Sequence, residues 1–215
     1  MKLSSKIWAI CISVYTIAMG LAVLNLAYKD NLAFRKYNYS LDCVREAELS
    51  YYETKALLVE EMQDYINNIS PESALRAYAI LDECEYFNVD PIFVLAQGEL
   101  ESHFGTKGIG AKLNNVFNVG VFDDLSYKQI SKRYKYDYPN ESIRPYLKLL
   151  TENYLSNGRN EDHLMRKFTD VNGNRYASDT HYEEKLTNKY NSIKNNTNIE
   201  KLYLTMKSYA IKCNR

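Results

Sequence analysis

The chain has 215 residues, of which 46% are apolar and 25% charged, a composition typical of a folded globular protein and not of a disordered one. Its 27 basic and 27 acidic side chains cancel. The chain therefore lacks the basic excess that is typical of nucleic-acid-binding proteins, and we expect no nucleic acid as a partner. The length allows one domain of ordinary size with an additional segment, and it excludes two large domains.

The N-terminal residues predict a membrane anchor. Residues 7–27 carry no charged side chain and lie between Lys6 and Lys29. A helix needs about 20 apolar residues to cross a bilayer, whereas the apolar region of a secretory signal peptide is shorter, about 7–15 residues. We expect residues 1–6 to be a cytoplasmic tail and residues 7–28 a transmembrane helix of a single-pass protein, with the rest outside the cytoplasm. A cleaved signal peptide is the alternative.

The next segments have helical periodicity. Residues 29–69 predict a helical stalk, because apolar and charged residues recur at helical spacing and no Gly or Pro interrupts them. Ser70-Pro71-Glu72 has the composition of a helix start, and we expect a folded domain over residues 70–215. Asp90-Pro91 predicts the start of a second helix, which ends near Phe104 with Gly105 as its C-terminal cap.

A smaller lobe is predicted beyond this helix. Thr106 to Leu113 can form a short helix, and residues 115–138 are rich in Val, Phe and Tyr, which is typical of a small strand or loop region. Helical patterns resume over residues 141–154, 161–168, 182–193 and 199–211. The domain is therefore expected to be mainly α, with one small β or irregular lobe.

Cysteines and histidines give no sign of a metal or redox centre. No two of the cysteines at 11, 43, 84 and 213 form a CxxC motif. A disulfide between Cys43 and Cys84 is possible only in an oxidising compartment. His163 and His181 have no partners at metal-ligand spacing. We expect no metal and no cofactor.

Glu101 is the residue with the clearest chemical potential. It lies in the last turn of an otherwise apolar helix, where the helix end is partially negative and apolar packing removes water. Both effects disfavour the ionised carboxylate and raise its pKa, and a carboxyl that stays protonated can donate a proton to a glycosidic oxygen. An arbitrary glutamate at a helix end is more often simply exposed. Glu99 is the second candidate, and it points to roughly the opposite face of the helix.

Three motifs around Glu101 resemble those of the glucosaminidase family of peptidoglycan hydrolases. They occur in the family's order and cover roughly residues 75 to 190. The first consists of Leu100, Glu101, Ser102, Gly105, Ala111, Asn114, Asn115 and Phe117; the second of Tyr138, Pro139, Glu141 and Ser142; and the third of Tyr176, Ala177 and Asp179, followed by Lys185 and Leu186.

The resemblance implies a lysozyme-like α+β fold and an endo-beta-N-acetylglucosaminidase that cleaves peptidoglycan glycan strands. Glu101 matches the catalytic acid and Tyr176 the active-site tyrosine. Asp123 or Asp124 could supply a second carboxylate, with a surface turn as the equally open alternative. The spacing of the two carboxyls would then decide between an inverting and a retaining route, and without a second carboxyl the substrate's N-acetyl group could act as the nucleophile.

Other residues near these motifs are candidates for substrate binding. Gln97 lies one turn before Glu101 on the same helix face, and Asn115, Phe117 and Asn118 belong to the segment that follows. The tyrosines at 127, 134, 136 and 138 could line a sugar groove or simply pack. The chain departs from the family at Asn118, where glycine is usual, and its acidic lobe is short.

Two rival functions remain open. Glu101-Ser102-His103-Phe104 also resembles the Glu-Ser-x-Phe of lytic transglycosylases, which share the lysozyme-like fold. The short acidic lobe would equally suit a protein that only binds glycan in a membrane or a virion. The sequence does not indicate an oligomeric state.

Overall fold

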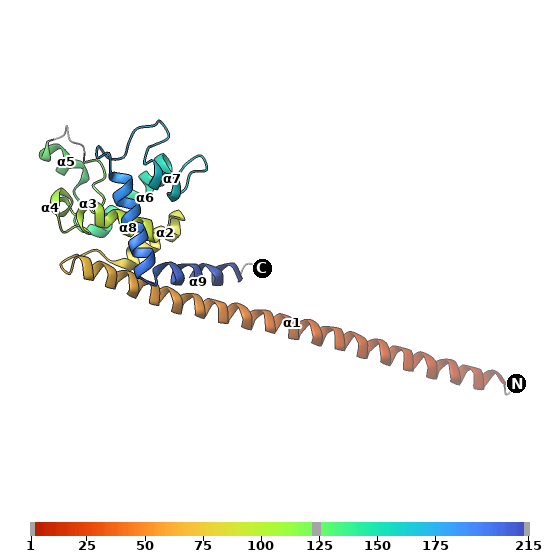
Figure 1. Ribbon diagram of the computed structural model, residues 1–215. Coiled ribbons are helices and arrows are strands. Elements are labelled where there is room, and N and C mark those ends of the chain that lie inside the picture. Colours follow the sequence, from red (N-terminus) through yellow and green to blue (C-terminus); the bar gives the residue numbers. More distant parts are fainter. Residues whose placement is uncertain (1–2, 122–125, 213–215) are drawn as a thin grey trace. The chain divides into compact units, whose positions relative to one another are not determined.

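The computed structural model describes the backbone of residues 3–121 and 126–212, and the side chains of residues 19–21, 23–39, 41–121 and 126–210. The described backbone is mainly helical (Figure 1), and its β-structure is an isolated bridge between Thr169 and Arg175. The chain divides into two compact units, one formed by Met1–Tyr51 with Ser208–Arg215 and the other by Tyr52–Lys207.

The first unit consists largely of the N-terminal part of helix α1, Leu3–Ile69. The side chains described between residues 19 and 46 are all exposed. Within the described part of the chain, no helix combines the length and the apolar character that a membrane crossing requires. The structure does not describe most of the side chains in the expected transmembrane helix at 7–28. The transmembrane helix therefore stays a prediction, which the structure does not support.

The second unit is built around helix α3, Pro91–Ser102, whose side chains from 91 to 99 are all buried. It packs most closely against α2 (Ala77–Phe87), α4 (Gly108–Leu113) and α8 (Tyr182–Asn196). A helix that is apolar on every side is expected at the centre of a fold. Its predicted start is confirmed, because the Asp90 carboxyl accepts a hydrogen bond from the amide of Ile92 at 2.8 Å.

The remaining helices agree with the periodicity of the sequence. The patterns over 141–154, 161–168, 182–193 and 199–211 each contain helix in the structure. The elements other than α8 are the 3-10 turn η1 (Pro139–Ser142), α6 (Ile143–Leu149), the π-helical turn η2 (Leu150–Tyr154), α7 (Glu161–Arg166) and α9 (Ile199–Lys212).

The lobe expected to be strand or loop over 115–138 contains no strand among its described residues. It is irregular over 115–121, as the loop alternative predicted, and helical over Tyr127–Tyr134, which neither alternative predicted. Helix α5 spans Tyr127–Tyr134 and begins with a capping box in which Ser126 and Gln129 exchange hydrogen bonds. Its one buried side chain is Ile130, three residues after Tyr127 and four before Tyr134, which is helical spacing. Aromatic content had suggested a strand, but the cap and this spacing favour a helix.

The helix predicted to start at Ser70 begins instead at Ala77. The Ser70 hydroxyl donates to the carbonyl of His103 at 2.9 Å and the Ser73 hydroxyl to the carbonyl of Phe104 at 2.7 Å. At the start of α2, the backbone N–H of Ala77 donates a hydrogen bond to the side-chain oxygen of Gln63, at 2.9 Å. The serine side chains therefore hold the end of α3 and do not cap a helix of their own.

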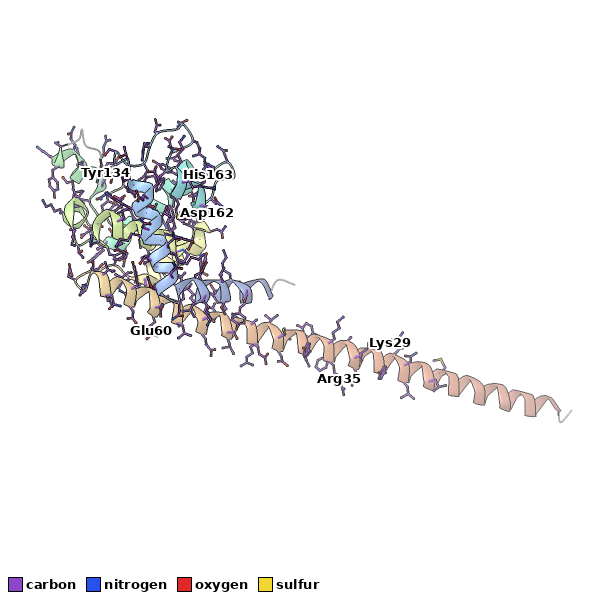
Figure 2. All side chains as sticks on the ribbon, viewed as in Figure 1. Lys29, Arg35, Glu60, Tyr134, Asp162 and His163 are labelled. Carbon is purple, nitrogen blue, oxygen red and sulfur yellow. The ribbon has the colours of Figure 1, made fainter. Side chains whose placement is uncertain are left out.

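The second unit includes the C-terminal part of α1, from Tyr52 onward, although we had expected the folded domain to start at residue 70. Leu58, Met62 and Ile66 on this part are fully buried, whereas Glu60, which Figure 2 labels, is exposed. One side of the helix thus belongs to the core of the unit.

The bridge considered between Cys43 and Cys84 is not formed, and both cysteines are free. Cys84 is buried in the core of the second unit, whereas Cys43 is an exposed residue of the first unit.

Candidate active site

The candidate site begins where α3 ends. The cap of α3 is His103, two residues earlier than the predicted cap at Gly105. Residues 103, 104 and 105 have φ angles of 48°, 55° and 79°, a left-handed run that only the glycine adopts without strain. The fully buried ring of Phe104 and the hydrogen bond from Ser73 to its carbonyl hold this turn. Tertiary packing therefore decides where the helix ends.

Glu101 lies one residue before the end of α3, with its carboxyl largely enclosed although the residue as a whole is partly exposed. The Tyr182 hydroxyl donates to Oε1 at 2.5 Å and the Asn118 amide donates to Oε2 at 3.0 Å. Burial raises the pKa of Glu101, while these two hydrogen bonds oppose the rise. The predicted direction of the pKa is confirmed, and removal of water is its main cause.

A buried chain of polar side chains lies behind Tyr182. The amide of Gln97 donates to the Tyr182 hydroxyl at 3.1 Å, and the Tyr146 hydroxyl donates to the other end of Gln97. Gln97 is fully buried, so its predicted contact with substrate stays a prediction that the structure does not support. Gln97 instead orients the tyrosine that holds Glu101.

Tyr182 was missed as a site residue. It lies on the first turn of α8, and α8 packs along α3. The sequence contained one weak signal, since Tyr182 follows the Tyr176-Ala177-x-Asp179 motif by three residues. In a chain with 20 tyrosines, that signal could not single it out without the packing of the two helices.

The segment after α4 supports the site through its interior. Asn115 is buried, and its amide bonds both the carbonyl and the N–H of Val119, at 2.9 and 3.1 Å. Phe117 is buried too, and its ring stacks on Tyr146 with centroids 4.0 Å apart. Neither side chain faces solvent, so substrate contact stays a prediction for both, which the structure does not support. Asn118, the fourth predicted substrate contact, directs its amide to Glu101 instead.

Ser102 ties α3 to this same segment. Its hydroxyl donates to the carbonyl of Val116 at 2.7 Å and accepts from the N–H of Gly105 at 2.8 Å. Gly110 makes the close approach possible, because a Cβ there would lie 2.7 Å from that of Ser102 and 2.9 Å from the carbonyl oxygen of Asn115. Ser102 is thus a local hydrogen-bonding residue.

Tyr176 joins the aromatic cluster beside Glu101. Its hydroxyl donates to the carbonyl of Phe117 at 3.1 Å, and its ring stacks on Phe168 at 4.4 Å with 15° between the planes. The ring centroid of Tyr182 is 5.6 Å away. Burial, together with the charge of Glu101, raises the pKa of Tyr176, so the phenol stays protonated and can act as a hydrogen-bond donor.

Glu99, the second candidate acid, has other partners. Lys189 of α8 forms an ion pair with its Oε1, and the Tyr65 hydroxyl of α1 donates to its Oε2 at 2.5 Å. Its carboxyl is buried between these two groups. Glu99 therefore fastens α1 and α8 to α3, and it is not free to serve as the acid.

The second carboxylate is not placed, because Asp123 and Asp124 lie outside the described residues. Among the tyrosines proposed for a groove, Tyr127 and Tyr138 are exposed. Tyr134, labelled in Figure 2, lies against Gly120, where a Cβ would be 2.3 Å from its ring. Within the described part of the chain, no group of three His, Cys, Asp or Glu residues is arranged to hold a metal.

Comparison with known proteins assigns the chain to a family. The family model described as "Mannosyl-glycoprotein endo-beta-N-acetylglucosaminidase" matches residues 77–195, which is more than half of the chain. The chain therefore belongs to the glucosaminidase family, and the matched stretch contains Glu101, Asn118, Tyr176 and Tyr182.

Two curated relatives come from Streptococcus pneumoniae, strains TIGR4 and R6, and both are named as proposed endo-beta-N-acetylglucosaminidases. Each is 29% identical to this chain over 102 residues, which is 47% of the chain. The match spans only 15% and 14% of the length of these relatives. The likeness thus concerns one domain of much longer proteins.

Proposed function

We propose that this protein is a peptidoglycan hydrolase that cleaves beta-1,4 glycosidic bonds next to N-acetylglucosamine, with Glu101 as the general acid. The observation that carries the proposal is the enclosed carboxyl of Glu101, whose burial raises its pKa while Tyr182 and Asn118 hold its two oxygens. Family membership and the names of the two relatives support a glycosidase. The helical architecture supports the lysozyme-like fold expected from the motifs.

The chemistry follows from the protonation state of Glu101. A protonated carboxyl gives its proton to the glycosidic oxygen as the bond to the sugar breaks, and this assistance contributes about 10²–10⁴-fold to the rate. Tyr176 would then orient the reacting sugar or the attacking water with its hydroxyl. The second group is the substrate's N-acetyl oxygen or one of Asp123 and Asp124. The N-acetyl oxygen or an aspartate acting as the nucleophile would retain the configuration of the anomeric carbon, whereas an aspartate that activates a water would invert it.

We further propose that the domain works on the outer side of the membrane, because its substrate lies in the cell wall. The uncharged run over residues 7–27 motivates the proposal of an anchor. Fractionation of cells that express the full chain tests it. Recovery of the intact protein from the soluble fraction, without detergent, would contradict the anchor.

A zymogram on purified cell wall tests the enzymatic function. Wild-type protein should clear the wall, and Glu101→Gln should lose about 10²-fold or more of the activity because the amide cannot donate the proton. Glu184→Gln, an exposed position on α8, is the matched control and should clear as wild type. Thermal unfolding of all three proteins verifies that they are folded.

The digestion products identify the reaction. Mass spectrometry should find reducing N-acetylglucosamine ends, whereas anhydro-muramic ends would show a lytic transglycosylase. Binding to wall without clearing, equal in wild type and Glu101→Gln, would mean that the protein only binds glycan.

A further inference from the structure

Asn118 makes two hydrogen bonds to Glu101. Its Nδ2 donates to the carboxyl Oε2 and to the backbone carbonyl oxygen of the same residue, both at 3.0 Å. One amide group thus joins the side chain of Glu101 to its own main chain. A carboxyl held in this way, with its second oxygen bonded to Tyr182, loses much of its rotational freedom.

The backbone at Asn118 is set by the turn in which it lies. Its φ is 50°, in the left-handed region that asparagine and glycine tolerate better than other residues. The buried amide of Asn115 spans the turn by bonding to both polar backbone groups of Val119. The turn is therefore held without the Asn118 side chain, which is left to face Glu101.

The orientation of the Asn118 amide has an unfavourable side. Its Oδ1 is buried and has no hydrogen-bond partner among the described residues, and it faces Gly110, where a Cβ would lie 3.1 Å away. The reverse orientation would direct this oxygen at two acceptor oxygens of Glu101. A buried acceptor left unpaired is costly, so the arrangement fits a role in holding Glu101 better than a role in stability alone.

We propose that Asn118 is a positioning residue that fixes the carboxyl of Glu101 for proton donation. This inference rests on the proposed function, because it gives Glu101 the role of the acid. Burial raises the pKa of Glu101 and the hydrogen bond from Asn118 lowers it. Asn118 therefore also limits the pH up to which Glu101 keeps its proton.

The test compares the pH dependence of kcat/KM on wall fragments in wild type, Asn118→Gly and Asn114→Gly. Asn114 is a matched control, because its φ is also 50° and its amide also donates to two oxygen atoms. These are the backbone carbonyl oxygens of Tyr136 and Asp137, and neither belongs to Glu101. Glycine keeps the left-handed backbone at either position.

Asn118→Gly should move the alkaline limb of the profile to higher pH. Burial raises the pKa of Glu101, and the variant removes one of the two hydrogen bonds that oppose this rise. Its kcat should fall roughly tenfold or more with little change in KM, since a misplaced acid slows the chemical step. Asn114→Gly should leave the limb in place. An unmoved limb in Asn118→Gly, or an equal shift in the control, would overturn the proposal.

A titration that needs no activity separates this proposal from the proposed function. With ¹³C-labelled glutamate carboxyls, the Glu101 signal is the one absent from Glu101→Gln, and it should titrate at higher pH in Asn118→Gly than in wild type. A shift without any wall cleavage would refute the function and uphold the contact, whereas an equal titration in both proteins overturns the contact.

Asn118→Asp covers the case in which the glycine variant does not fold. Aspartate also tolerates a left-handed backbone, and a second carboxylate beside Oε2 disfavours ionisation of Glu101. The Glu101 signal should again titrate at higher pH than in wild type. An unchanged titration would mean that residue 118 does not contact the acid.

Discussion

At the scale of single residues, the site is defined by how few groups hold the carboxyl of Glu101. Tyr182 and Asn118 bond one oxygen each, and burial has a larger effect on the pKa than both bonds together, because the net shift is upward. The partners therefore orient the acid and moderate the rise in its pKa. Tyr182 is in turn oriented by Gln97.

Tyr182→Phe should slow the chemistry and extend activity to higher pH. The sign follows from the causes of the shift: the bond from Tyr182 lowers the pKa of Glu101, so its loss leaves the pKa higher and the acid protonated further into the alkaline range. Loss of the partner of Gln97 should also lower the free energy of unfolding by about 1–3 kcal/mol. A pH profile of kcat and a urea unfolding curve measure both effects.

Tyr190→Phe is the control for this variant. Tyr190 lies on the same helix and donates to a carboxyl oxygen of Asp90 at 2.7 Å, outside the site. It should alter stability but not the pH profile. Should both variants move the profile alike, the effect would belong to the helix and not to the bond with Glu101.

At the scale of elements, the end of α3 is held by the segment that precedes α2. Tyr65 of α1 bonds Glu99, and Ser70 and Ser73 bond the carbonyls of the two residues after α3. Glu101 lies between these points of attachment. The position of the acid therefore depends on residues before position 77, where the family match begins.

Met62→Ala should destabilise the second unit although residue 62 lies outside the family match. Met62 is fully buried, and truncation of such a side chain costs about 2–5 kcal/mol. Glu60→Ala on the exposed side of the same helix should change stability by less than about 0.5 kcal/mol. Chemical denaturation of both variants measures the difference, and equal small losses would show that α1 is not part of the core.

At the scale of the whole molecule, the compact unit is larger than the family match. The unit spans Tyr52–Lys207, whereas the match spans residues 77–195. The additional residues contribute buried side chains at both ends, among them Leu58 and Ile66 on α1 and Ile199 and Met206 on α9. A fragment limited to the match would expose the apolar surface that these side chains cover.

A fragment of residues 52–207 should therefore fold cooperatively, and a fragment of residues 77–195 should not. Circular dichroism during thermal unfolding distinguishes them, because only the first should show a sharp transition. A cooperative transition of the shorter fragment would show that the flanking helices are dispensable.

The sequence by itself determined the central helix, its start at Asp90-Pro91 and the approximate placement of most other helices. It also determined that Glu101 carries a raised pKa and, through its motifs, the family. Periodicity and capping are properties of neighbouring residues, so they can be read along the chain. An apolar helix with a carboxyl near its end is such a local pattern.

Only the tertiary structure decided which groups surround that carboxyl. Tyr182 is 81 residues from Glu101 and Asn118 is 17 residues from it, and both reach it because α8 and the segment after α4 pack beside α3. The same packing ended α3 at His103, started α2 at Ala77 and buried Gln97, Asn115 and Phe117, which we had expected to contact substrate. A local pattern shows that a side chain is polar, but its hydrogen-bond partner depends on which elements meet in space.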